Sequence, residues 1–187
     1  MIKVSNLINP KFVYSLITHY YPTNYFSFKH KGRTFSFKLL NYEERTEKLQ
    51  KRLNKQRTDF TPPDFIKHVF RTVEGCKYVI FQGIIENHFI QFKLEGNVLE
   101  LDFPITSENY LIKHLKDVRK LLESLNFSFT DIELEPMKYI YRVDSDEDLH
   151  CLNANFADNT DLATQFIVKV FQDIFESDIS LVSVKLG

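Results

Sequence analysis

The chain has 187 residues, of which 43% are hydrophobic and 26% are charged, and its formal net charge is −1. This composition is typical of an ordinary globular protein and excludes a mainly disordered chain. No stretch approaches the roughly 18 consecutive apolar residues of a membrane-spanning helix, so the sequence predicts no such span.

The charge is distributed unevenly along the chain. Residues 1–75 hold 14 Lys and Arg against 6 Asp and Glu, a net charge of +8. Residues 76–187 hold 10 against 19, a net charge of −9. This asymmetry indicates either an anionic partner for one part of the chain or electrostatic contact between the two parts.

The first 60 residues predict a small basic αββα unit. Asn9 and Pro10 suit the start of a helix whose apolar positions run to Tyr20. Apolar and polar residues then alternate over 26–29 and again over 35–39, with a turn at Lys31-Gly32, which predicts a β-hairpin.

A polar helix is expected next, over 41–57, with Leu49 and Leu53 as its main apolar positions. The segment Thr58-Asp59-Phe60-Thr61-Pro62-Pro63 breaks this helix. We therefore predict a domain boundary near residue 60, between a basic unit (1–60) and an acidic α+β body (61–187).

In the body, segments whose apolar residues recur with the period of a helix alternate with segments that have the two-residue period of a strand. A helix is expected over 64–73, and strands are expected over 77–81, 89–94 and 98–103. The next helix is capped by Thr106 or Ser107 and carries an apolar stripe to Leu125. Strands over 139–143 and 149–156 follow, then a helix over 160–175 capped by Asp158 or Thr160, and a short strand over 179–186 can close the chain.

Residues 64–176 thus give the order α-β-β-β-α-β-β-α. This order predicts an α+β fold in which helices pack on a curved antiparallel sheet. The succession resembles the type III secretion chaperone-like fold, over about 113 residues and without a signature motif. The resemblance implies a cytosolic, usually dimeric protein that binds another polypeptide through its sheet face and helices.

A run of basic residues on the predicted polar helix is the clearest candidate binding site. Nucleic-acid or other anionic partners require clustered Lys and Arg that can displace counterions. The alternative is a solvated helix face that Glu43, Glu44 and Glu47 partly neutralise. The basic residues are Arg45, Lys48, Lys51, Arg52, Lys55 and Arg57.

The sequence contains no recognisable metal or cofactor motif. Its six histidines form no H-x-H or H-E-x-x-H pair. The acidic run from Asp144 to Asp148 has Leu149 and Asn155 where a calcium loop needs Gly and Glu, so we expect an exposed hairpin turn. We predict no cofactor and no bound metal.

No catalytic constellation stands out either. Cys76 and Cys151 lie far apart and are expected to be reduced thiols in the core. Glycine-rich phosphate-binding motifs and the G-x-S-x-G motif do not occur. We predict no catalytic residue; the sequence favours a non-enzymatic function and leaves an enzymatic one open.

Two functional hypotheses follow. The first is a cytoplasmic protein-binding domain, a chaperone-like or toxin-immunity-like adaptor, whose acidic body attracts a basic protein. The alternative is nucleic-acid binding through the basic first third. Met1 to Asn6 include no apolar signal segment, which favours the cytoplasm. We also expect a homodimer, from the resemblance and from the broad apolar arc of the helix over 160–175. This arc must be covered on more than one side, either by a second subunit or by the chain's own N-terminal third.

Overall fold

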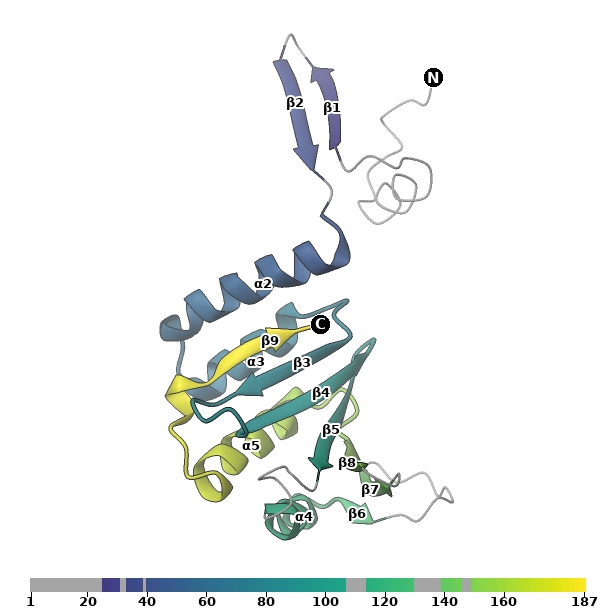
Figure 1. Cartoon of the computed structure of the whole chain (residues 1–187), viewed down its shortest axis with the longest axis vertical. Helices are drawn as coiled ribbons and strands as arrows, with labels where there is room; N and C mark the ends of the chain where they lie inside the picture. Colours follow the sequence, from purple (N-terminus) through teal and green to yellow (C-terminus); the bar gives the residue numbers. More distant parts are fainter. Residues whose placement is uncertain (1–24, 31–32, 39, 107–113, 130–138, 146–148) are drawn as a thin grey trace. The chain divides into compact units, whose positions relative to one another are not determined.

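The computed structural model describes residues 25–30, 33–38, 40–106, 114–129, 139–145 and 149–187 (Figure 1). The chain divides into two compact units, Met1–Arg45 and Thr46–Gly187. The described helices include none that is long and apolar enough to cross a membrane.

The first unit contains the predicted hairpin. Strands β1 (Tyr25–His30) and β2 (Arg33–Lys38) pair antiparallel. The helix expected from Pro10 to Tyr20 lies outside the described residues. Helix α2 (Tyr42–Gln56) begins in this unit, and its start is fixed by a reciprocal cap. The backbone N–H of Glu44 donates to Asn41 Oδ1 over 2.7 Å, and the N–H of Asn41 donates to Glu44 Oε2 over 3.3 Å.

The second unit is built on a seven-stranded sheet with the order β6-β7-β8-β5-β4-β3-β9. All neighbouring strands pair antiparallel except β6 with β7, so the sheet is mixed where the sequence predicted an antiparallel one. The strands are β3 (Tyr78–Gln82), β4 (Phe89–Glu95), β5 (Val98–Thr106), β6 (Ser128–Phe129), β7 (Ile140–Ser145), β8 (Leu149–Asn155) and β9 (Ser183–Leu186). The β7–β8 hairpin is as expected, although its acidic turn at 146–148 lies outside the described residues.

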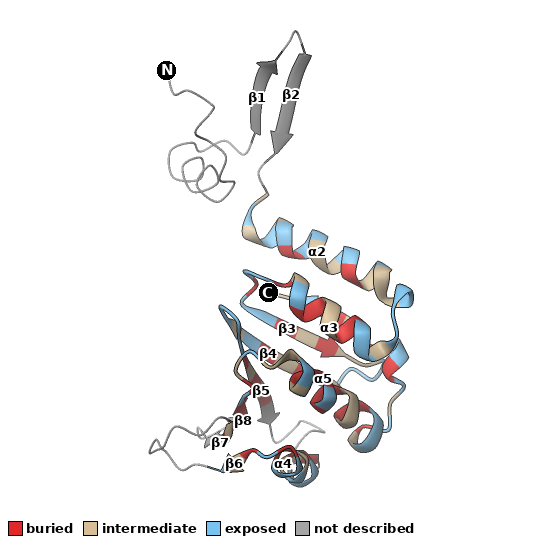
Figure 2. Ribbon diagram, turned by 180° about the vertical axis from the view of Figure 1, so that it is seen from behind, coloured by how far each residue is buried: buried red, intermediate tan, exposed pale blue. Residues whose placement is uncertain are grey.

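Helices pack on one face of this sheet, which confirms the predicted α+β class. Figures 1 and 2 show α3 (Pro62–Thr72) and α5 (Thr160–Lys169) side by side on this face. The third helix, α4 (Leu115–Ser124), buries Val118 and Leu122. It also joins the helix-covered face of the sheet, because the hydroxyl of buried Tyr141 donates to Glu123 over 2.9 Å.

The core between sheet and helices is rich in phenylalanine. Phe156, directly after β8, is fully buried and contacts three other aromatic rings. Its ring centroid is 4.7 Å from that of Phe127, 5.4 Å from that of Phe92 and 5.4 Å from that of Phe166. One aromatic side chain thus joins a strand, the segment after α4 and helix α5.

The second half of α2 belongs to the body. Leu53 is fully buried in the core, and Asn54 lies beside β9. The amide of Asn54 accepts from the backbone N–H of Val184 over 2.7 Å and donates to its carbonyl over 2.8 Å. Gln50 Oε1 accepts from the N–H of Leu186 over 3.0 Å. The compact units therefore divide after Arg45, whereas the sequence placed the boundary near residue 60.

The last helix differs from its prediction in two details. Asn159 caps it, not Asp158 or Thr160, since Asn159 Oδ1 accepts from the N–H of Leu162 over 2.9 Å. After Lys169 the helix continues as a π-helical segment, η4 (Val170–Ile174), which inserts a wider turn before Phe175. A 3₁₀ turn, η5 (Ile179–Leu181), then precedes β9.

The apolar arc of this last helix is covered within one chain. Of its apolar residues, Ala163, Phe166, Ile167, Val170 and Phe171 are buried, and Leu162 and Ile174 are half-buried. The broad apolar arc therefore does not require a second subunit to cover it. Dimerisation itself stays a prediction.

Candidate functional site: the open face of the sheet

The two faces of the sheet have different chemistry. Along β5, Leu99, Leu101 and Phe103 are buried toward the helices, whereas Glu100 and Asp102 alternate with them and lie on the opposite face. No described helix packs on that opposite face, and in Figure 1 it lies toward the viewer. We call it the open face.

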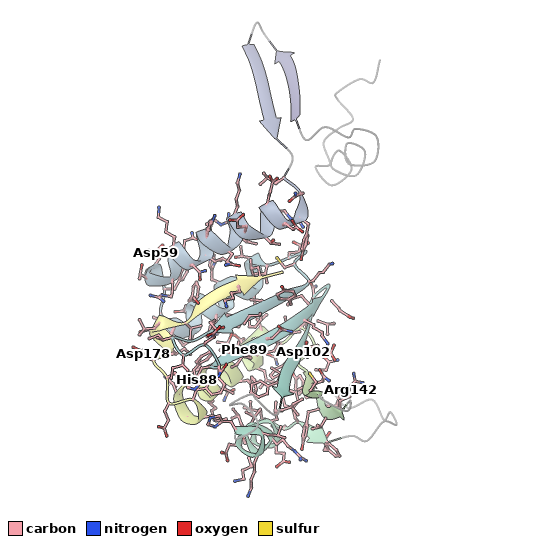
Figure 3. All side chains as sticks on the ribbon, in the orientation of Figure 1. Asp59, His88, Phe89, Asp102, Arg142 and Asp178 are labelled. Atoms are coloured by element: carbon pink, nitrogen blue, oxygen red, sulfur yellow. The ribbon has the colours of Figure 1, made fainter. Side chains whose placement is uncertain are left out.

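A row of polar side chains crosses the open face from strand to strand. Arg142 on β7 is opposite Asn153 on β8, and Asn153 is opposite Asp102 on β5. Gln91 on β4 continues the row, and its Nε2 donates to Asp102 Oδ2 over 2.8 Å. Asp102 and Arg142 can be followed in Figure 3. The register of four strands thus brings together residues from distant parts of the sequence.

Asp102 is the centre of this row. Its carboxylate accepts from Gln91 and from the thiol of Cys151, which donates to Oδ1 over 2.6 Å. The Lys93 ammonium lies 3.4 Å from Oδ2. The Asp102 side chain is only 13% exposed and Asn153 is 6% exposed. These partners satisfy the oxygens of a carboxylate that is largely removed from water.

This arrangement does not suit nucleophilic catalysis. A thiol attacks as its thiolate, and a carboxylate hydrogen-bonded to the thiol opposes the ionisation that is needed. Cys151 is not the fully buried core thiol that the sequence predicted, because it is half-buried and faces Asp102. Cys76 is buried, and neither cysteine is part of a disulfide.

Apolar and aromatic side chains surround the polar row. Tyr78 and Val98 are exposed, and Ile80 and Phe89 are half-buried on the same face. Charges of both signs are interspersed among them, with Lys93, Arg142 and Lys185 beside Glu95 and Glu100. The open face thus presents apolar side chains together with hydrogen-bonding and charged groups.

The predicted basic residues lie elsewhere, on or next to α2. Lys48, Lys51, Arg52 and Lys55 are exposed on the side of α2 opposite Leu53, so the structure brings these four together. Arg45 belongs to the first unit, where its guanidinium lies 5.6 Å from the Tyr42 ring centroid. Arg57 lies beyond the helix and lines a small cleft of about 280 Å³ with Phe60 and Leu181.

Two buried histidines, His88 and His114, contact the same phenylalanine ring. His88, which precedes β4, is 3% exposed, and its ring stacks on Phe175 with centroids 4.6 Å apart. Its Nδ1 is 2.7 Å from Ser177 Oγ. The buried ring of His114 contacts the same Phe175 ring edge-on. Among the described residues, no three His, Cys, Asp or Glu side chains are placed to hold a metal ion.

His88 is expected to make the fold sensitive to acid. Burial lowers the pKa of His88 below its ordinary value, and nearby His114 lowers it further. The unfolded chain therefore binds a proton at this site near its ordinary pKa of about 6.5, before the folded chain does. We expect the free energy of unfolding to be unaffected by His88 above that pH and to fall as the pH drops below it.

Urea unfolding at a series of pH values tests this expectation against the variant His88→Gln, which retains a polar side chain but cannot titrate. The variant is expected to be less stable near neutral pH and to lose less stability on acidification than the native chain. Parallel curves for the two proteins would assign the acid sensitivity to other groups.

Asp102 was not among the site residues predicted from the sequence. The alternation over 89–94 and 98–103 does place Gln91, Lys93 and Asp102 away from the core, and that signal was present. The pairing of β5 with β8, which adds Cys151 and Asn153, joins strands about 50 residues apart and has no local signature.

Comparisons with protein-family models, with curated proteins and with solved structures found no match to this chain.

Proposed function

We propose that this chain is a non-enzymatic protein-binding domain that holds its partner on the open face of the sheet. The carrying observation is the network around Asp102, a nearly buried carboxylate with three side-chain partners in the middle of a face that no described helix covers. Its apolar surroundings supply contact area, and the fixed polar centre supplies orientation. The resemblance to the type III secretion chaperone-like fold supports the same mode of binding, as a chaperone-like or immunity-like adaptor.

The charge of the body supports a basic partner. Residues 76–187 carry a net charge of −9, so a positively charged protein would be attracted to them. Such binding weakens as salt screens the charges. The proposal of a basic partner would be wrong if the recovered protein were acidic, or if its binding were insensitive to salt.

Matched surface variants test the use of the open face. Tyr78 and Val98 are 37% and 38% exposed on that face, whereas Phe60 and Leu181 are 37% and 39% exposed outside it. The tagged chain would first recover its partner from the source cells at low salt, and mass spectrometry would identify it. Affinity for the purified partner is then measured for Tyr78→Ser/Val98→Ser and for the control Phe60→Ser/Leu181→Ser.

The open-face variant is expected to bind at least about tenfold more weakly, because its two truncated side chains together lose about 1.4 kcal/mol or more of apolar contact with the partner. The control is expected to bind as the native chain does. Equal losses in both variants, or full binding by the open-face variant, would contradict the proposal. Urea unfolding of each variant confirms that the compared proteins are folded.

A further inference from the structure

The exposed side of α2 is separate from the open face, and the proposed protein-binding function does not use it. The helix is fixed to the body through its inner side, by buried Leu53 and by the bonds of Asn54 and Gln50 to β9. Its outer side is therefore presented to solvent at a defined place, as Figure 2 shows by the exposed residues along α2.

Three cations form a stripe along this outer side. Lys48, Arg52 and Lys55 are exposed and, at 3.6 residues per turn, lie within an arc of about 60°. The rise of the helix separates Lys48 from Arg52 by about 6 Å and from Lys55 by about 10 Å. We call these three residues the α2 stripe.

The α2 stripe has no neutralising partner within the described part of the chain. Neither an ion pair nor a hydrogen bond engages Lys48, Arg52 or Lys55 there. The neighbouring acids are used elsewhere, since Glu47 pairs with Lys51 and Glu44 caps the helix. The sequence left open that the basic residues are a solvated helix face neutralised by neighbouring glutamates. That alternative explains Lys51, which pairs with Glu47, but it does not explain the α2 stripe.

The composition of the outer side distinguishes among anionic partners. A helix that lies on a membrane inserts apolar side chains between lipids. The exposed positions of α2 carry only charged side chains, and its apolar residues Leu49 and Leu53 pack against the core. A closely spaced row of unpaired cations without apolar contacts instead suits a polymer whose negative charge repeats at short intervals, as a phosphodiester backbone does.

We propose that the α2 stripe binds the phosphate backbone of nucleic acid. Lysine and arginine contacts to phosphate position a protein on nucleic acid but do not read its bases, so the binding has no sequence preference. Three contacts predict a log–log salt slope of about −2.7 on a DNA duplex, or affinity about 40-fold weaker at roughly 200 mM than at roughly 50 mM salt.

The test is fluorescence anisotropy of labelled DNA duplexes of two unrelated sequences, titrated with the full chain at both salt concentrations. Lys48→Glu/Arg52→Glu/Lys55→Glu is expected to abolish binding, and the milder Lys48→Gln/Arg52→Gln/Lys55→Gln to weaken it by about tenfold or more. The control Lys116→Glu/Lys120→Glu/Lys169→Glu makes the same change in net charge on α4 and α5, and it is expected to retain most of the native affinity.

Three outcomes would overturn the proposal: no binding by the native chain near 50 mM salt, equal losses in the stripe and control variants, or binding to phosphatidylserine vesicles in place of DNA. The glutamine variant removes the charges without adding repulsion and keeps good helix-forming residues, so loss of binding by a folded protein is attributable to the stripe. Tyr78→Ser/Val98→Ser is expected to bind DNA normally, which separates failure of this proposal from failure of the proposed protein-binding function.

Discussion

Replacing Phe156 with alanine is expected to lower the free energy of unfolding by about 3–5 kcal/mol, the usual cost of emptying a buried aromatic site. Phe156 is fully buried and contacts the rings of Phe92, Phe127 and Phe166. Its neighbours come from a strand, from the segment after α4 and from α5, so no single element can move to fill the space.

Urea unfolding measures this effect as a fall in the midpoint with an unchanged slope. Ile84→Ala is the control, because Ile84 is 73% exposed and its truncation is expected to change stability by no more than about 0.5 kcal/mol. A loss below about 1 kcal/mol for Phe156→Ala would mean that the ring cluster is not packed as described.

Leu53→Ala is expected to cost about 2–5 kcal/mol, because the leucine is fully buried although it lies on an otherwise polar helix. The neighbouring Arg52→Ala is the control: it shortens an exposed side chain on the same turn and is expected to be nearly neutral. Both are measured by urea unfolding of the full chain.

This comparison also bears on the domain boundary. If α2 packs on the body through Leu53, the alanine variant lowers the stability of the main unfolding transition. If residues 1–60 instead formed a separate unit, as the sequence predicted, the main transition would be unchanged and any loss would appear in a separate, minor one.

The order of the helices and strands could be predicted from the sequence because the spacing of apolar residues within each segment distinguishes a helix from a strand. The alternation of apolar Ile90 and Phe92 with polar Gln91 and Lys93, together with the turn at Gly96-Asn97, specifies the β4–β5 hairpin locally. The helical repeat of Phe65, Ile66, Val69 and Phe70 likewise identifies α3, and all four are buried.

Contacts that depend on distant pairing could not be predicted in the same way. Asn54 looks like one more polar residue on a polar helix, and only the folded chain places it against Val184, 130 residues later. Asp102 likewise gains its partners from β4 and β8 at once. The candidate binding face is therefore a product of sheet register, whereas the α2 stripe follows from helix periodicity and was visible in the sequence.

The bonds between α2 and β9 have a consequence for solubility. β9 is the last strand on its side of the sheet, and a terminal strand offers unpaired backbone groups to any passing strand from another molecule. Asn54 occupies both groups of Val184, and Gln50 occupies the N–H of Leu186. Two amide side chains on a helix thus block strand addition at this border, and protection against aggregation is encoded about 130 residues upstream of the strand that needs it.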